Sequence, residues 1–227
     1  MLVRRLQLIC STLAAAGGAA LGAPNEIKVF TDELASYRKH TLETHVNKAR
    51  TGPLRVMPEY SYGLWRNWEF SLQLPLAFTS QSANGEGYRA ELQYVAPHDD
   101  ARGFYWGINV ELARDYRLDE PHFWNLEFIP IVGLRTGRWH FAANPGIERP
   151  LSGRERSATA TPAAKAAYLV SGKNYLGLEY YVEAQSRMLY LAWDGKLGKS
   201  DINFGIGRGS TPASDRWVLK TIYEIAF

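Results

Sequence analysis

Charged and polar side chains alternate with apolar ones along much of this chain, and their spacing decides what chemistry they can share. Residues two apart in an extended strand point to the same side, so Glu43 and His45 would face one compartment, as would Arg89 and Glu91. The candidate residues lining this compartment are Glu43, His45, Glu59, Glu69, Arg89, Glu91, Glu111, Glu127, His140, Glu179, Glu183, Lys220 and Glu224.

Carboxylates outnumber cations in this set, and two interpretations need the same residue types. The residues could form a salt-bridged network that fills an interior, because buried charges require partners. Alternatively, they line a narrow acidic conduit, which would favour cations or amine-bearing solutes electrostatically. The sequence leaves both interpretations open.

A catalytic or metal site is not predicted. The five histidines form no metal-binding helix pair, and the chain has no Gly-x-Ser-x-Gly elbow. Glu43-Thr44-His45 could ligate a metal, but a satisfied polar pair is the favoured interpretation. His122 with a loop serine such as Ser157 is conceivable for lipid hydrolysis, although no spacing singles it out. We expect no cofactor, and the pattern favours a protein that is not an enzyme.

Strict alternation over residues 68–78 indicates the elements that position these side chains. Trp68, Phe70 and Leu72 share one face of that segment, and Glu69 and Gln73 share the other. The same period predicts twelve strands near residues 40–50, 54–64, 68–78, 87–97, 103–113, 122–133, 137–148, 162–170, 173–184, 187–195, 199–208 and 215–227.

The strand pattern predicts a closed antiparallel transmembrane β-barrel over residues 40–227. Many of these segments have the roughly 9–11 residues that a tilted strand needs to cross hydrocarbon. A sheet within lipid must close, so the last strand should pair with the first near Thr41–Arg50. A soluble β-sandwich is the lesser alternative.

Aromatic residues near the strand ends suggest two interfacial girdles. One predicted girdle comprises Trp65, Trp68, Tyr105, Trp106, Trp139, Tyr175, Trp193 and Phe227. The other comprises Phe78, Tyr88, Tyr116, Trp124, Tyr181, Tyr190 and Trp217.

Residues 1–22 have the features of a cleaved export signal. Arg4 and Arg5 precede an apolar run that ends in small residues, which predicts a mature start at Ala23. The only cysteine, Cys10, lies in this segment, so the mature chain would offer no thiol chemistry. Removing the segment lowers the formal net charge from +3 to +1 and leaves no polybasic tract for nucleic acid. Residues 23–39 are predicted to be a short periplasmic or lumenal lead-in.

The last strand is apolar on one face and charged on the other, and it ends in Phe227. It resembles the C-terminal signal strand of bacterial outer-membrane barrels, with Tyr223, Ile225 and Phe227 as the expected assembly signal. Further phrases that carry a resemblance are Leu42–Asn47, Pro58–Leu64, Asn144-Pro145-Gly146 and Asn203–Gly209. With these, the chain resembles poorly characterised proteobacterial outer-membrane barrels. It is loosely similar to the barrel family associated with the meta-pathway of phenol degradation.

These observations predict a porin-like channel or transporter for small solutes in the Gram-negative outer membrane. The expected partners are outer-membrane lipid, lipopolysaccharide and the outer-membrane assembly machinery, with the solute unknown and no nucleic acid. The alternatives are an outer-membrane lipid-modifying enzyme and a closed structural or adhesion barrel. For adhesion, Pro150–Thr161 would be the contact loop, although a solvated or lipopolysaccharide-facing charge cluster is the favoured interpretation.

Overall fold

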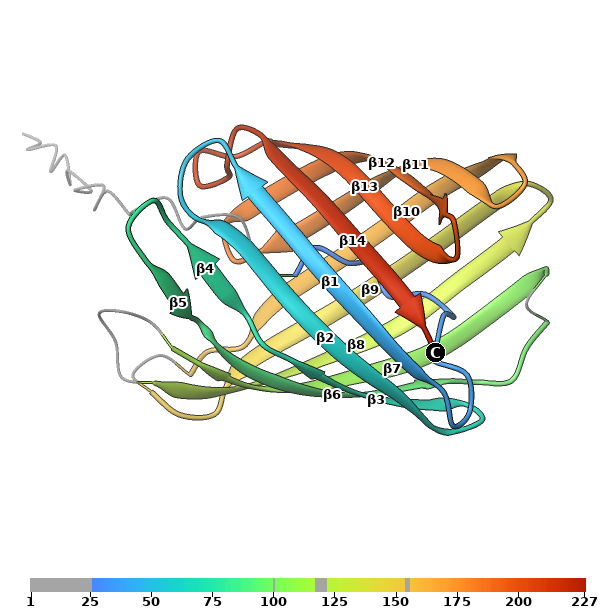
Figure 1. The fold of residues 1–227 in the computed structure, drawn as a ribbon, viewed down its shortest axis with the longest axis horizontal. Helices are drawn as coiled ribbons and strands as arrows, with labels where there is room; N and C mark the ends of the chain where they lie inside the picture. Colours follow the sequence, from blue (N-terminus) through green and yellow to red (C-terminus); the bar gives the residue numbers. More distant parts are fainter. Residues whose placement is uncertain (1–25, 100, 117–121, 154–155) are drawn as a thin grey trace, which may run out of the picture.

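The computed structural model describes residues 26–99, 101–116, 122–153 and 156–227, which form one sheet wrapped into a barrel (Figure 1). The predicted export signal, residues 1–22, lies outside the described residues. The strands are β1 (His40–Ala49), β2 (Leu54–Trp65), β3 (Trp68–Gln73), β4 (Leu76–Phe78), β5 (Ala83–Gly85), β6 (Gly87–Val95), β7 (Gly103–Asp115), β8 (Phe123–Thr136), β9 (Trp139–Pro150), β10 (Thr159–Ser171), β11 (Asn174–Glu183), β12 (Ser186–Leu197), β13 (Ser200–Gly209) and β14 (Val218–Ala226).

Every strand pairs antiparallel with its neighbours, and the sheet closes on itself. β1 pairs with β2 on one side and with β14 on the other, where Thr41 lies opposite Ala226 and Ala49 opposite Val218. The result is a closed twelve-stranded antiparallel barrel, because β3 with β4, and β5 with β6, are interrupted halves of two wall strands. The predicted fold class and the predicted closure are therefore confirmed. Among the described residues, no helix is long and apolar enough to cross a bilayer.

One predicted strand, residues 68–78, is wrong as a continuous element. It breaks between Gln73 and Leu76, because Pro75 has no N–H to donate to a ladder. β3 pairs with β6 and β4 pairs with β5, so the same two wall strands remain neighbours on both sides of the break. The predicted loop Thr79–Glu86 accordingly contains a short strand, β5.

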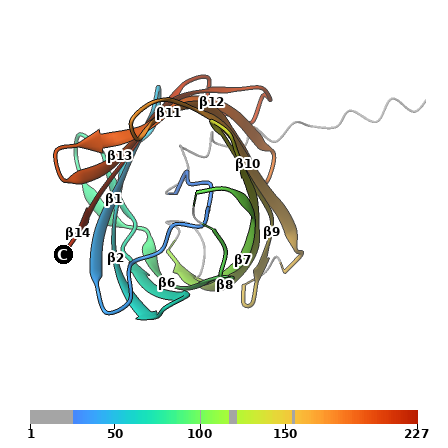
Figure 2. The same ribbon diagram turned by 90° about the vertical axis from the view of Figure 1, so that its right-hand side faces the viewer.

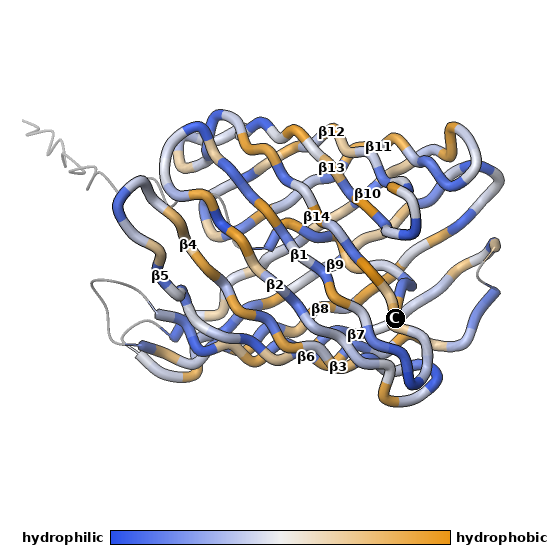
Figure 3. Tube along the Cα trace, in the orientation of Figure 1, coloured by the Kyte–Doolittle hydropathy of each residue, from blue (hydrophilic) through white to orange (hydrophobic). Residues whose placement is uncertain are grey.

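The exterior of the barrel is apolar and the interior polar, as alternation along each strand requires. On β12, the outward Leu189 and Leu191 are 48% and 55% exposed, while the intervening Tyr190 is 0% exposed. Figure 3 shows the same alternation of apolar and polar positions along the strands. An aqueous surface of this composition would be unfavourable, whereas lipid accommodates it.

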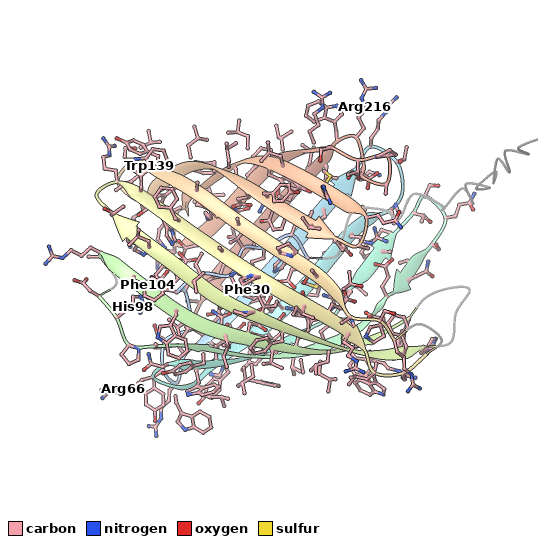
Figure 4. All side chains as sticks on the ribbon, turned by 180° about the vertical axis from the view of Figure 1, so that it is seen from behind. Phe30, Arg66, His98, Phe104, Trp139 and Arg216 are labelled. Atoms are coloured by element: carbon pink, nitrogen blue, oxygen red, sulfur yellow. The ribbon has the colours of Figure 1, made fainter. Side chains whose placement is uncertain are left out.

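The two ends of the barrel are distinguished by the chain termini of the wall. His40 N donates to Phe227 O at 3.1 Å at the end that we call proximal, and the opposite end is distal. β2, β6, β8, β10, β12 and β14 begin at the distal end, because neighbours are antiparallel. Figure 4 places the Phe30 side chain inside the wall, with Arg66, Phe104 and Trp139 toward the proximal end.

Residues 26–38, which we call the lumenal segment, run inside the barrel before β1 begins (Figure 2). Ile27 packs with Ala49, Met188 and Tyr190 in one buried apolar cluster. Phe30 packs with wall residues in a second cluster. Of the two positions predicted for this lead-in, the structure shows the lumenal one.

Four tyrosines assigned to the aromatic girdles point inward instead. Tyr105 and Tyr190 are 1% and 0% exposed, and the Tyr181 hydroxyl accepts from Lys220 in the lumen. Tyr175 lies opposite the lumenal Asp194, with its ring 6.2 Å from that of His140. Tyr105 and Tyr190 lie across from glycines, because a Cβ at Gly133 or Gly207 would approach their rings to 2.0 and 2.3 Å. Those predictions were wrong because they used position along the strand and neglected which face each residue occupies.

Candidate functional site in the barrel lumen

The lumen contains a charged network centred on Lys220. Its ammonium group is fully buried, contacts the Glu179 carboxylate, and donates to Ile27 O at 3.1 Å. Lys165 Nζ lies 3.6 Å from Glu179 Oε1 and 2.7 Å from Asp194 Oδ2. Two cations therefore compensate two carboxylates across β10, β11, β12 and β14. The charges on this side of the lumen are paired with one another.

A second group joins β1 and β2. His45 Nε2 lies 2.5 Å from Glu43 Oε1 and 3.4 Å from Glu59 Oε2. Lys28 of the lumenal segment places Nζ 2.9 Å from Glu43 Oε1. The sequence-predicted pair of Glu43 and His45 thus shares one face, and Glu59 and Lys28 join it across strands.

A third group faces it from β6 and β7. Arg89 Nη1 lies 3.3 Å from Glu111 Oε2 and 3.9 Å from Glu26 Oε2. Glu91 accepts hydrogen bonds from Gln73 Nε2 at 2.6 Å and from Asn109 Nδ2 at 3.0 Å. Carboxylates exceed cations here.

Asp32 anchors the lumenal segment at the proximal end. Arg135 donates to both oxygens of Asp32, at 3.0 and 2.5 Å, and His98 Nε2 lies 3.0 Å from Oδ2. Burial works against a charged carboxyl, but the hydrogen bonds and charge of Arg135, with the hydrogen bond of His98, hold the pKa of Asp32 below its usual range. Asp32 is therefore a carboxylate at neutral pH.

The backbone of the lumenal segment is also bound to the wall. Asn144 accepts from Phe30 N at 2.8 Å and donates to Phe30 O at 3.0 Å, which imitates strand pairing. Gln93 Nε2 donates to Glu33 O at 3.2 Å, and Ala35 N donates to Glu69. Buried peptide groups need such partners, so these contacts allow the segment to lie in the lumen without a sheet of its own.

The remaining predicted lining residues are distributed along the lumen. Glu127 accepts from Thr161 Oγ1 at 2.6 Å, and His140 Nε2 lies 2.8 Å from the Tyr105 hydroxyl. Glu183 borders the distal cavity, and Glu224 lies opposite Glu43 in the β1–β14 register. The predicted set is thus brought into one interior but divided among several groups.

A cavity of about 330 Å³ occupies the distal part of the lumen. Its wall extends to residues at distal strand ends, such as Arg55 and Asp115, and includes Glu26 and Phe30 of the lumenal segment. Seven carboxylates and three cationic side chains line it, namely Glu26, Glu86, Glu111, Asp115, Glu127, Glu148 and Glu183 with Lys28, Arg55 and Arg89. Arg55 is paired with Glu86 at 2.9 Å, and Asp115 and Glu183 also have partners. The other lining carboxylates, Glu26, Glu111, Glu127 and Glu148, still outnumber Lys28 and Arg89.

The sequence prediction missed the site residues that belong to the lumenal segment. Glu26, Lys28 and Asp32 occur in a stretch with no period of two, and their partners lie far along the chain. Arg135 was missed because the predicted strand ended near residue 133, whereas β8 continues to Thr136.

Comparisons with known proteins identify no family, because no family model and no curated protein matches this chain. Solved structures are similar at low identity. Outer membrane phospholipase A from Escherichia coli shares 10% identity over 85% of this chain and 96% of its own, with a TM-score of 0.47. LpxR from Salmonella typhimurium shares 5% over 82% and 99%, with a TM-score of 0.46. OmpTdeltaL8, a variant of an outer membrane protein of Vibrio cholerae, shares 9% over 83% and 98%, with a TM-score of 0.42.

This chain has the fold of a closed twelve-stranded antiparallel β-barrel. Its own strand pairing and apolar exterior establish the architecture, and likeness at this level assigns no activity. The resemblance to barrels associated with phenol degradation stays an expectation from sequence motifs. Tyr223, Ile225 and Phe227 lie on the exterior, 37%, 39% and 62% exposed, and their role in assembly stays a prediction.

Proposed function

We propose that this protein is an outer-membrane channel or transporter for small cationic or amine-bearing solutes, kept closed by its own lumenal segment. The acidic cavity between the distal strand ends and that segment carries the proposal. An excess of carboxylates in a confined, partly desolvated space concentrates cations and repels anions.

The exterior supports insertion in the outer membrane, with lipid and lipopolysaccharide as partners. Large apolar side chains are exposed around the wall, including Leu72, Leu178 and Leu191 at 49%, 51% and 55%. A closed antiparallel wall leaves no strand edge in the hydrocarbon. In this arrangement the distal end faces outward and the proximal end faces the periplasm, with export through the predicted signal peptide.

The lumenal segment explains why passage requires a conformational change. It binds β14 through Ile27, β1 through Lys28 and β9 through Phe30, so its contacts reach opposite parts of the wall. Asp32 then fixes it to β8. A solute entering the distal cavity would therefore meet this segment, which must shift before transport.

Planar-bilayer recording and liposome swelling test the proposal. The comparison is between the wild type and the double variant Lys28→Met with Asp32→Asn, which removes two side-chain anchors of the segment. We expect low conductance from the wild type and larger, cation-selective conductance from the double variant. Glu33→Gln is a matched control, because this carboxylate lies on the same segment and its residue is solvent-exposed.

A folded double variant that passes neither ions nor small solutes would exclude the channel proposal. The same preparations test the alternative of a lipid-modifying enzyme. Such an enzyme would release lipid products, and replacing a catalytic histidine would abolish their release. His122, whose ring stacks on Tyr116 at 4.3 Å, is the histidine to replace first. Absence of both flux and products would support a closed structural or adhesion barrel, for which the predicted loop includes Arg154 and Glu155 outside the described residues.

A further inference from the structure

Three carboxylates meet in the lumen where the lumenal segment faces β6 and β7. One oxygen from each of Glu26, Glu91 and Glu111 lies within 4.8 Å of the other two. Arg89 faces them, with Nη1 3.3 Å from Glu111 and 3.9 Å from Glu26. Three negative groups at this separation repel one another unless a further positive charge or protons compensate them.

Buried amide oxygens without partners provide an independent observation beside this cluster. Asn109 is 0% exposed and Gln73 is 3% exposed, and neither Oδ1 of Asn109 nor Oε1 of Gln73 has a hydrogen-bond partner. Each side chain donates its NH₂ group to Glu91, at 3.0 and 2.6 Å. These bonds fix the amide orientation, because the flipped amide would place its oxygen against the carboxylate.

Glu26 itself has an unused ligand atom. Its Oε1 is buried and has no hydrogen-bond partner, whereas Oε2 is the atom 3.9 Å from Arg89. An unpaired buried polar atom is unfavourable, and three of them around one acidic cluster call for a missing positive ligand. The residues with these unpaired oxygens come from the lumenal segment, β3 and β7.

The donor set indicates the class of ligand. Carboxylate and amide oxygens, with no sulfur or nitrogen, are the ligands of hard divalent cations. Calcium–oxygen bonds of about 2.3–2.6 Å place two ligands on opposite sides of the ion roughly 5 Å apart. Oxygens within 4.8 Å of one another therefore match one ion bound among them. A neighbouring group of Glu26, His45 and Glu59 also exists, but His45 is already held between Glu43 and Glu59.

We propose that Glu26, Glu91 and Glu111, with Asn109 and Gln73 beside them, form a binding site for a divalent cation such as Ca²⁺. The sequence predicted no metal site, because Glu26 lies outside the strand pattern. Glu26 and Glu111 line the distal cavity, so an ion reaches the site from that end. Since Glu26 belongs to the lumenal segment, the bound ion joins that segment to β6 and β7. This site does not depend on the proposed transport function.

Calorimetric titration with CaCl₂ and MgCl₂, and electron paramagnetic resonance with MnCl₂, test the site. Protein refolded without lipopolysaccharide and treated with a chelator would be compared with Glu26→Gln and Glu91→Gln. We expect one ion per barrel for the wild type and at least about tenfold weaker binding for each variant, because loss even of a supporting group weakens metal sites about 10–100-fold. Glu148→Gln is the matched control, since Glu148 lines the same cavity but lies outside the cluster, and it should bind as the wild type does.

Hydrogen exchange supplies a second measurement. Calcium should slow amide hydrogen exchange in residues 26–33 of the wild type. In Glu91→Gln, calcium should leave the exchange of these residues unchanged. Glu26→Gln guards against misfolding, because Glu26 is outside the barrel wall, and heat-modifiable migration confirms that the barrel is folded. The proposal is overturned if the folded wild type binds none of the three ions below about 1 mM, or if Glu26→Gln and Glu91→Gln bind them as tightly as the wild type.

Discussion

At the residue scale, the buried charges of the lumen are stabilising only in their pairs. Lys220 has no exposed surface, and Glu179, which it contacts, is 2% exposed. Removing one partner leaves the other buried without its compensating charge, which costs more than removing both. The charges of the lumen therefore specify how the strands and the lumenal segment fit together.

We expect Lys220→Met to destabilise the barrel by about 3–5 kcal/mol, because Glu179 loses its closest cation. The double variant Lys220→Met with Glu179→Gln should recover part of that loss. Urea unfolding in lipid vesicles measures both. Lys196→Met is the control, since Lys196 pairs with Asp201 at 2.6 Å on the surface, and exposed pairs contribute about 0–1 kcal/mol. Equal losses for Lys220→Met and Lys196→Met would contradict the argument.

Asp32 is the residue on which docking of the lumenal segment depends at the proximal end. Asp32→Asn keeps the shape but removes the charge that faces Arg135 and His98. Charged hydrogen bonds contribute about 1.5–3 kcal/mol, so local opening of residues 29–35 should become about 10–100-fold more frequent. Hydrogen exchange measures the change, with Glu33→Gln as the charge-matched control. Unchanged protection in Asp32→Asn would show that other contacts hold the segment.

At the element scale, the strands could be predicted because their alternation is strict. Eleven of the twelve predicted segments coincide with observed strands to within a few residues, including the Ala-rich β10. The exception is 68–78, where Pro75 interrupts the wall. The lumenal segment could not be placed from sequence, because its contacts, such as Phe30 with Asn144, join residues 114 positions apart and follow no local period.

Gly63 on β2 lies against the backbone at the end of the lumenal segment. A Cβ there would lie 2.2 Å from Ser36 O and 2.7 Å from Ala35 O, both rigid backbone atoms. Arg38 N also donates to Gly63 O at 2.8 Å. The approach of two backbones requires the absence of a side chain at this position.

We expect Gly63→Ala to displace residues 35–38, with a cost of about 1–3 kcal/mol, as for other overpacked sites. Spin-label mobility at residue 37 and single-channel conductance should both increase. Gly85→Ala is the control, because a Cβ at Gly85 meets nothing within 4 Å. A segment that stays as immobile in Gly63→Ala as in Gly85→Ala would show that β2 does not hold it.

At the scale of the whole molecule, the sequence predicted a polar interior but could not say how it is filled. The salt-bridged network and the acidic conduit that the sequence left open each describe part of the interior. The charges around Lys220 are paired, whereas the distal cavity retains excess carboxylates. Which charges pair depends on register across the closed wall and on the lumenal segment. Neither follows from alternation along single strands.

The strand pattern nevertheless assigns the exterior, and that assignment leads to a test of membrane insertion. Leu178 lies midway along β11, is 51% exposed and is opposite Leu191 of β12, so it should face the centre of the hydrocarbon. Leu197, 62% exposed, ends β12 at the proximal rim. An arginine on the lipid face costs about 2–4 kcal/mol at the bilayer midplane and about 0–1 kcal/mol near the interface. Leu178→Arg should therefore lower the free energy of unfolding in phosphatidylcholine vesicles far more than Leu197→Arg. If both variants unfold at the same urea concentration as the wild type, the exterior of this barrel does not face hydrocarbon.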